Sequence, residues 1–219
     1  MSRPTRCTPW LAAAALLWAF APAALAAGPA PEPVLRIEAT MHTATPKRIA
    51  TDRDGRFAVT ASDDKTVRVW DATSGGLLQV LRPPIDEGNE GKLFAVAITP
   101  DGESVAAAGW TGWKWHPHGS VYIFDRASGT LRQRLSGLPS AVNHLAFSPD
   151  GRWLAAALGG PHGVRVWDWR SPRPVPAQDK ADAASYGLGW SADGRLAATS
   201  HDGRIRLYRA ASAAGHRAA

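Results

Sequence analysis

The sequence feature that most constrains the fold is a unit that occurs four times, each time around an Asp-Gly pair. The pairs are spaced about 43 to 49 residues apart, at Asp54-Gly55, Asp101-Gly102, Asp150-Gly151 and Asp193-Gly194. A short apolar segment precedes each pair, and a second one follows it. Because glycine accepts the positive φ that a tight turn needs, Asp-Gly between two apolar segments predicts a β-hairpin.

A third segment follows each hairpin and ends in an aromatic residue. These segments read VRVWD, VYIFD, VRVWD and IRLYR, and their aromatic residues are Trp70, Phe124, Trp167 and Tyr208. Alternation of apolar and polar residues in VRVWD predicts a strand with one solvated face. FAVTA and WLAAAL are instead apolar on both faces, as expected for strands between neighbouring sheets. A period of this length with three or four short strands per unit predicts the blades of a β-propeller.

Residues 60–71, TASDDKTVRVWD, together with TPDG at 99–102 and SPDG at 148–151, resemble the WD-repeat propeller family. The resemblance covers about residues 34–209 and implies four-stranded blades around an axis that act as a rigid platform for interactions. The chain is also similar to the propeller half of exported bacterial WD-repeat proteins, some of which are fused to a caspase-like peptidase domain. No part of a peptidase domain is present in this sequence.

The family resemblance also implies a buried set of four hydrogen-bonded side chains. In this sequence the set maps onto His42, Thr60, Asp64 and Trp70. The last repeat keeps Asp202 but has Ala198 and Tyr208 in place of the threonine and the tryptophan, and the second and third repeats lack the aspartate. We therefore expect one complete tetrad, and we expect the other blades to depend more on packing.

The predicted architecture is an all-β propeller of about four blades, at about 39–85, 92–137, 140–178 and 184–209. The fourth strand of the third blade would fall in the proline-rich segment RSPRPVPAQ. Residues 34–38 offer a strand that would close a small four-bladed ring. The interpretation that we favour is an open arc, whose exposed end faces would allow self-association.

Residues 1–26 have the form of a secretory signal peptide. Arg3 and Arg6 precede eleven continuously apolar residues (10–20), and Ala24-Leu25-Ala26 provides small residues for cleavage. The alternative, a membrane anchor, would need roughly 20 apolar residues. We therefore expect a periplasmic or extracellular protein with no stable membrane anchor after cleavage, a Pro/Ala linker at 27–33 and a disordered tail at 210–219. Cleavage would remove the only cysteine, Cys7.

The most unusual segment is the loop between the second and third strands of the second repeat, GWTGWKWHPHG. Exposed aromatic side chains often anchor a protein partner. The candidate partner-binding residues are those of this loop and a histidine of the corresponding loop in the next repeat: Trp110, Trp113, Trp115, His116, His118 and His162. The alternative is that the tryptophan rings pack against the edge of their own blade.

Catalytic and cofactor motifs are not found in the sequence. It contains no nucleophile elbow, phosphate-binding loop or dinucleotide fingerprint, and the loop histidines lack metal-ligand spacing, so we predict no enzyme activity, no metal and no cofactor. The arginines of the third segments, Arg68, Arg165, Arg204 and Arg206, are expected on solvated strand faces, and specific nucleic-acid binding is not expected. The predicted function is a non-catalytic scaffold for protein partners. The alternatives are a fragment of a propeller-containing hydrolase and a propeller enzyme with an axial site that includes His144.

Overall fold

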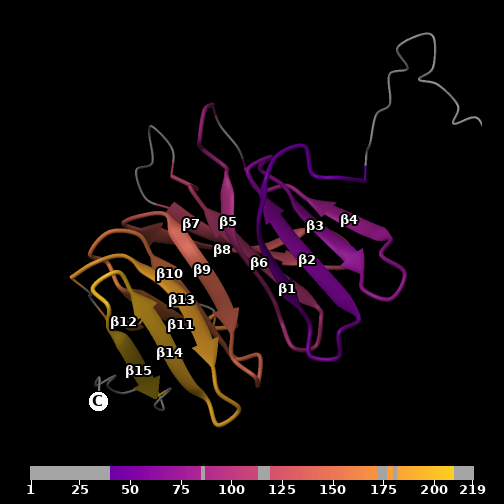
Figure 1. Ribbon diagram of the computed structural model, residues 1–219. Helices are drawn as coiled ribbons and strands as arrows, with labels where there is room; N and C mark the ends of the chain where they lie inside the picture. The colour runs from indigo at the N-terminus through magenta and orange to yellow at the C-terminus, as the bar shows by residue number, and fades with distance from the viewer. Residues whose placement is uncertain (1–39, 85–86, 113–118, 172–176, 180–181, 210–219) are drawn as a thin grey trace, which may run out of the picture. The chain divides into compact units, whose positions relative to one another are not determined.

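The computed structural model describes residues 40–84, 87–112, 119–171, 177–179 and 182–209, and all the regular elements in these residues are β-strands (Figure 1). The signal peptide, the linker, the closing strand at 34–38 and the C-terminal tail that we predicted lie outside the described residues. The described residues belong to one unit, Thr40–Ala219. They contain no helix long and apolar enough to cross a membrane.

Four antiparallel sheets follow one another along the chain. The first sheet contains β1 (Pro46–Thr51), β2 (Phe57–Ser62), β3 (Val67–Asp71) and β4 (Leu77–Leu81). The second contains β5 (Leu93–Ile98), β6 (Ser104–Gly109), β7 (Gly119–Asp125) and β8 (Leu131–Leu138). The third contains β9 (Val142–Phe147), β10 (Trp153–Leu158), β11 (Val164–Asp168) and β12 (Ala177–Asp179), and the fourth contains β13 (Ser185–Trp190), β14 (Arg195–Ser200) and β15 (Ile205–Arg209).

The Asp-Gly pairs lie in the connections between the first and second strands of the sheets. Gly55, Gly102, Gly151 and Gly194 all have positive φ, between 65° and 79°, which confirms the predicted turns. In the second sheet the Thr99 hydroxyl donates a hydrogen bond to the carboxylate of Asp101, which also accepts one from the backbone N–H of Glu103 at 3.0 Å. The side-chain hydrogen bonds and the glycine together fix the direction in which the second strand leaves the turn.

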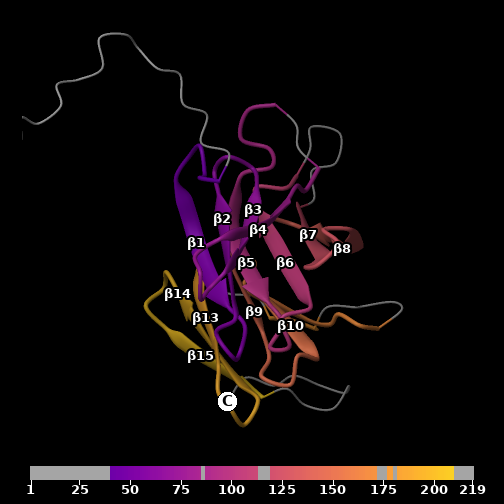
Figure 2. The ribbon, with the colours of Figure 1, turned by 90° about the vertical axis from the view of Figure 1, so that its right-hand side faces the viewer.

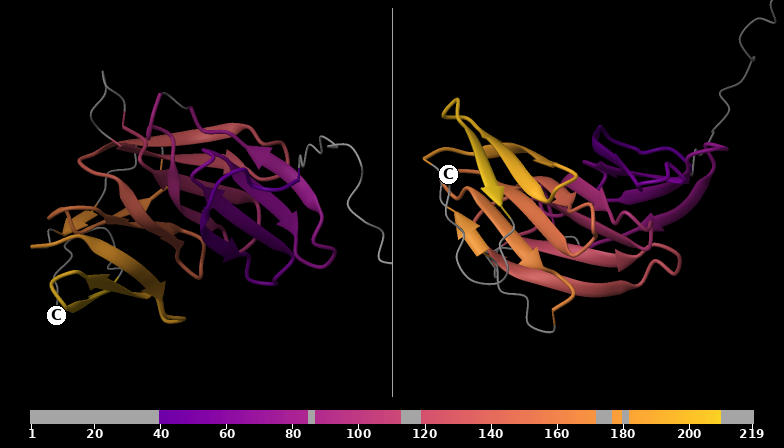
Figure 3. Two further views of the ribbon diagram at one scale, coloured as in Figure 1. Left: turned by 45° about the horizontal axis from the view of Figure 1, so that its top comes forward. Right: turned by 90° about the horizontal axis from the view of Figure 1, so that it is seen from below.

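The first strands of the four sheets lie next to one another: β1 contacts β5, β5 contacts β9, and β9 contacts β13 (Figure 2). The sheets follow each other around this inner set of strands, as Figure 3 shows. Arg48 on β1 also donates a hydrogen bond at 3.3 Å to the carbonyl of Asn143 on β9, so the first and third sheets meet on the inner side. This arrangement confirms the predicted all-β class, with sheets that stack like the blades of a propeller.

The hydrophobic core consists of three layers, one between each pair of consecutive sheets. Val59, Val67 and Val69 of the first sheet pack against residues of the second sheet such as Val96 and Tyr122. The central layer is formed by the second and third sheets, and a smaller third layer joins the third and fourth sheets. Each sheet therefore stabilises its neighbours by burying apolar area that it cannot bury alone.

The prediction that the third-strand arginines are solvated is wrong for Arg68 and Arg165, which are only 6% and 7% exposed. Arg68 lies between Thr60 and Val80 in the register of the first sheet. The Arg165 guanidinium donates to the carbonyls of His162 and Val164, and burial lowers the pKa of Arg165. The third strand lies inside its sheet, so a polar residue there is covered by neighbouring strands and sheets, and alternation in the sequence does not indicate a solvated face.

Candidate functional site

The four side chains of the expected tetrad lie within hydrogen-bond distance of one another in the first sheet. His42 Nδ1 lies 2.8 Å from Asp64 Oδ2, and His42 Nε2 lies 2.8 Å from Thr60 Oγ1. The Trp70 indole N–H donates to Thr60 Oγ1, also at 2.8 Å. The hydrogen bonds connect the segment before β1 with β2, β3 and the turn between them, so this cluster has a structural role at the end of the first sheet.

Thr66 is a further member of this cluster that the sequence analysis missed. Its hydroxyl donates to Asp64 Oδ1 at 2.6 Å, and its backbone N–H donates to the same oxygen at 3.0 Å. Burial acts to raise the pKa of Asp64, but the hydrogen bonds from Thr66, His42 and Thr43 outweigh it and lower the pKa below its usual value. The carboxylate therefore stays charged and holds the turn before β3.

Trp110 follows β6 and differs from most of the large apolar residues because its side chain is 50% exposed. Its backbone is held firmly: the N–H donates to the Lys92 carbonyl at 2.9 Å, and the carbonyl accepts from the Gly91 N–H at 2.7 Å. An exposed indole on a fixed backbone is suited to bind a partner with little loss of conformational entropy.

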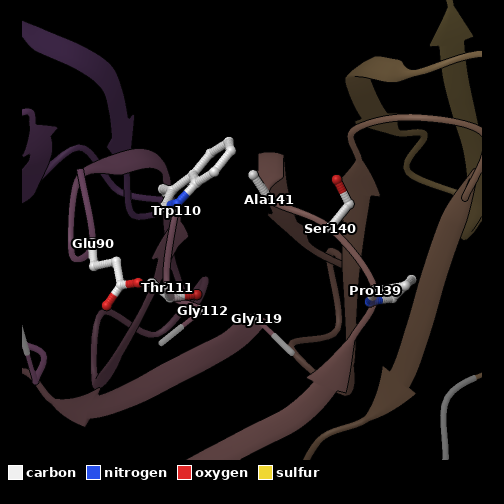
Figure 4. A pocket seen from close by; sticks show the side chains of 8 residues that line it. All are labelled: Glu90, Trp110, Thr111, Gly112, Gly119, Pro139, Ser140 and Ala141. Carbon is white, nitrogen blue, oxygen red and sulfur yellow. The ribbon is translucent and has the colours of Figure 1, made fainter. Parts of the chain in front are cut away.

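The Trp110 side chain borders a cavity of about 290 Å³ at one end of the second sheet, beside the connection to the third sheet. The cavity is lined by Glu90, Trp110, Thr111, Gly112, Gly119, Pro139, Ser140 and Ala141. Figure 4 shows Trp110 on one side of the opening and Ser140 and Ala141 on the other. The Thr111 hydroxyl is buried and fully used, because it donates to the Ser120 carbonyl at 2.7 Å and accepts from the Ser120 N–H at 2.9 Å. We call this feature the Trp110 cavity.

Glu90 gives the Trp110 cavity its electrostatic character. Its Oε2 atom is buried and has no hydrogen-bond partner among the described residues. A buried acceptor without a partner is costly, and a donor from a bound molecule would satisfy it. A carboxylate and an exposed indole in one cavity suit a cationic side chain, which can pair with the acid and pack on the ring.

The other predicted binding residues are not brought together with Trp110 in the described structure. Trp113, Trp115, His116 and His118 lie outside the described residues. His162 is partly buried in the connection between β10 and β11 and does not line the Trp110 cavity. The sequence analysis also missed the opposite wall, formed by Pro139, Ser140 and Ala141. This segment directly follows β8, and the pairing of Leu138 with Gly119 brings it to the cavity.

His144 lies on the inner strand β9, the position of the alternative enzyme site. Its Nδ1 accepts a hydrogen bond from the Leu188 backbone N–H at 2.9 Å. Burial, together with the positive charge of Arg48, lowers the pKa of His144 to about 4. The neutral imidazole therefore joins the third and fourth sheets. Among the residues that the structure describes, no group of three or more His, Cys, Asp or Glu side chains could hold a metal ion.

Among the described residues, three four-stranded antiparallel sheets and one three-stranded sheet follow one another with adjacent first strands, and this arrangement defines the class of the protein as a β-propeller. Three segments, residues 36–71, 129–168 and 182–209, match the family model described as "WD domain, G-beta repeat". The matched segments overlap mainly the first, third and fourth sheets, and the all-β architecture is consistent with the blades of a WD-repeat propeller.

Several curated proteins are similar to this chain. Small ribosomal subunit protein RACK1y of Oryza sativa subsp. japonica is 30% identical over 72% of this chain and 45% of its own length. Coronin-7 of Rattus norvegicus is 34% identical over 57% of this chain and 13% of its own length. Protein hir1 of Schizosaccharomyces pombe is 29% identical over 80% of this chain and 19% of its own length. The chain thus spans less than half the length of these relatives.

Proposed function

We propose that this protein is a non-catalytic scaffold that binds a protein partner through the loops around the Trp110 cavity. The observation that carries the proposal is the Trp110 indole, half exposed beside a cavity whose buried Glu90 oxygen has no hydrogen-bond partner in the described part of the chain. The WD40 repeats support a role in protein–protein interaction, because a rigid stack of blades holds its loops in fixed positions.

The chemistry of the Trp110 cavity indicates a basic side chain of the partner as the group that enters it. A lysine or arginine would donate to Glu90 and place its aliphatic stem or its charge against Trp110. Pro139 and Ala141 would contact the apolar part of the side chain from the opposite wall. Replacement of Glu90 by glutamine keeps the shape and removes the charge, so it separates the electrostatic contribution from the contribution of packing.

The proposal is tested by comparing partner capture by the wild type and by Trp110→Ala from an envelope extract, with quantification by mass spectrometry. A central aromatic contact contributes about 2 kcal/mol or more, so Trp110→Ala should weaken binding of the specific partner roughly thirtyfold. Glu90→Gln should weaken it less and should reduce its dependence on salt. Because Trp110 is half exposed, the melting temperature should change little.

Tyr186→Ala is the matched control, because Tyr186 is an equally exposed aromatic residue, 51%, on β13 and does not line the cavity. Its replacement should leave partner capture unchanged. If Trp110→Ala and Tyr186→Ala reduce capture equally, or if neither does, the proposed binding site is wrong.

Export belongs to the same proposal and is supported by the charge and hydropathy of residues 1–26. The more specific similarity to exported bacterial WD-repeat proteins also remains a proposal. The expected mature protein begins at Ala27, and N-terminal sequencing of protein recovered outside the cytoplasm checks this. Recovery of the chain with its first residues intact in the cytoplasm would contradict it.

The alternatives to a scaffold are not favoured by a specific observation among the described residues. The axial enzyme site would depend on His144, and the Nδ1 atom of this residue is already bonded to the Leu188 backbone. The interpretation as part of a hydrolase depends on the family resemblance alone.

A further inference from the structure

Five Asp-Gly pairs lie in turns of the described structure, and one of their aspartate side chains is held differently from the other four. The aspartates are Asp54, Asp101, Asp150, Asp193 and Asp202. An aspartate before glycine can rearrange when the glycine backbone nitrogen attacks the side-chain carboxyl group, because glycine has no side chain to block the approach. The reaction needs a carboxyl group that can turn toward this nitrogen. Hydrogen bonds to the carboxylate therefore decide which pairs can react.

Hydrogen bonds hold the carboxylates of four of the five pairs. In the second, third and fourth sheets, the hydroxyl of Thr99, Ser148 or Ser191 donates to the aspartate two residues later. Asp202 accepts a hydrogen bond from the Arg206 guanidinium at 2.6 Å. Each of these carboxylates would have to leave its donor before it could react with the glycine that follows it.

The carboxylate of Asp54 is the exception. Among the described residues it accepts no hydrogen bond, and its ion pair with Arg56 Nε is long, 3.6 Å. The cause is the residue two positions earlier, where the first sheet has Asp52 in place of the threonine or serine. A carboxylate has no proton to donate, and the oxygens of Asp52 instead accept from the Phe57 N–H and from Arg56 Nε, each at 2.9 Å. The Asp54 side chain can therefore rotate toward the backbone of Gly55.

Asp193 is the closest match to Asp54 among the other four aspartates. The two side chains are 62% exposed at Asp54 and 59% exposed at Asp193, and each has an arginine two residues later within ion-pair distance. A Cβ atom on Gly55 or on Gly194 would contact nothing within 4 Å, so both turns have room to rearrange. Asp193 differs because the Ser191 hydroxyl donates to it, and this hydrogen bond also holds the pKa of Asp193 below its usual value. A comparison of the two pairs therefore measures the effect of the hydroxyl.

We propose that Asp54-Gly55 is a site of spontaneous isomerisation, at which aspartate is converted to isoaspartate faster than at the other four pairs. The Gly55 nitrogen forms a bond to Cγ of the protonated Asp54 carboxyl group, and the carboxyl hydroxyl leaves with the amide proton as water. Water then opens the resulting succinimide ring. Cleavage between the nitrogen and Cγ restores aspartate, whereas cleavage between the nitrogen and the backbone carbonyl carbon gives isoaspartate. The sequence of steps needs no oxidant, reductant or further reactant.

Isomerisation would alter the turn between β1 and β2. Isoaspartate adds one methylene group to the main chain and leaves the former backbone carboxyl as a free side group, so the turn no longer fits the register of the two strands. Arg53, directly before Asp54, donates to the Pro149 carbonyl in the equivalent turn of the third sheet. The altered turn would therefore also weaken a contact between sheets. The Trp110 cavity is not part of this turn, so the proposal is independent of partner binding.

The selectivity is tested by prolonged incubation of the purified full chain at neutral pH, followed by digestion and mass spectrometry with electron-based fragmentation, which distinguishes isoaspartate from aspartate. We expect isoaspartate to accumulate at Asp54 roughly tenfold faster than at Asp193, because release of a hydrogen bond to a charged group costs about this factor in rate. In concentrated urea the two rates should become similar. Equal rates in the folded protein, or the same difference in urea, would overturn the proposal.

Two variants exchange the features of the two turns. Asp52→Ser gives the first turn the hydroxyl of the third and fourth sheets, which should hold Asp54 and slow its isomerisation. Ser191→Ala removes the hydroxyl and should raise the rate at Asp193 toward that of Asp54. In each variant the unchanged turn is the internal control, and circular dichroism checks that the protein is folded. Rates that neither variant changes would show that the hydroxyl does not protect the aspartate, and the proposal would be wrong.

Discussion

At the scale of single residues, the structure shows that buried polar side chains join elements that are distant in the sequence. His42 and Asp64 connect the segment before β1 with the turn before β3. His144 connects β9 with the backbone of β13, 44 residues further along. The sequence indicated that His42 and Asp64 form a pair, through the family resemblance. It gave no sign of the bond between His144 and Leu188, because this bond depends on how the third and fourth sheets pack.

His144 predicts a pH dependence of stability. Burial and the charge of Arg48 lower its pKa to about 4 in the folded protein, against 6.5 for the ordinary side chain. The unfolded chain therefore binds more protons between these values, and the free energy of unfolding should fall as the pH falls from about 6.5 to about 4, by at most about 1.4 kcal/mol per pH unit. Urea denaturation at a series of pH values measures this slope.

The control is His144→Gln, which cannot titrate and can still offer an oxygen to the Leu188 N–H. It should be less stable than the wild type near neutral pH, and it should lose the part of the pH dependence that belongs to His144. An unchanged slope in this variant would show that other groups cause the acid sensitivity.

At the scale of elements, the four Asp-Gly turns share a glycine with positive φ but differ in the side chains that form hydrogen bonds within the turn. In the second, third and fourth sheets a serine or threonine hydroxyl two residues earlier donates to the turn aspartate. In the first sheet the equivalent position is Asp52, whose Oδ1 accepts a hydrogen bond from the Phe57 N–H at 2.9 Å. In the other three sheets the hydroxyl likewise accepts a hydrogen bond from the backbone N–H of the first residue of the second strand. Either a hydroxyl or a carboxylate can therefore bind the backbone at the start of this strand.

Gly102 and Gly194 provide a matched pair for a prediction about these turns. Both have positive φ, so alanine at either position costs roughly 1 kcal/mol of stability. A methyl group at Gly102 would in addition lie 2.9 Å from the Phe57 ring, whereas at Gly194 it would contact nothing within 4 Å. We expect Gly102→Ala to lower the free energy of unfolding clearly more than Gly194→Ala, as measured by urea denaturation.

The reason for this expectation is that Phe57 cannot easily move. Its ring packs against the first core layer, and the Arg126 guanidinium lies 3.9 Å from the ring centre. Equal losses of stability for Gly102→Ala and Gly194→Ala would mean that the turn of the second sheet has more freedom than the structure indicates.

At the scale of the whole molecule, stability depends on the junctions between consecutive sheets. The second and third sheets have a neighbour on both faces and contain many fully buried residues. Among the described residues, the fourth sheet has three strands, shares its core layer with the third sheet and exposes Ile205 and Leu207. Repeats that contact only their neighbours are expected to unfold first at a free end.

Amide hydrogen exchange should therefore be fastest in β13, β14 and β15 among the strands and slowest in β6, β7 and β10. The tetrad should protect β2 and β3 although the first sheet is also at an end. Exchange of all four sheets at one rate would show instead that the unit unfolds in a single step.

The sequence by itself determined the number and kind of the repeated units. Asp-Gly turns, alternating third strands and apolar second strands are local patterns, and each depends on the backbone preferences of a few neighbouring residues. For this reason the strands, the positive φ of the turn glycines and the all-β class could be predicted.

Only the tertiary structure decided which side chains are buried between sheets and which remain exposed. Arg165 and Ile205 both lie on third strands, yet the charged side chain of Arg165 is 7% exposed and the apolar side chain of Ile205 is 70% exposed. The cavity beside Trp110 likewise requires residues 139–141 from the connection between β8 and β9. Burial in a stack of sheets depends on which sheet lies on either side, and no local pattern in the sequence records that neighbour.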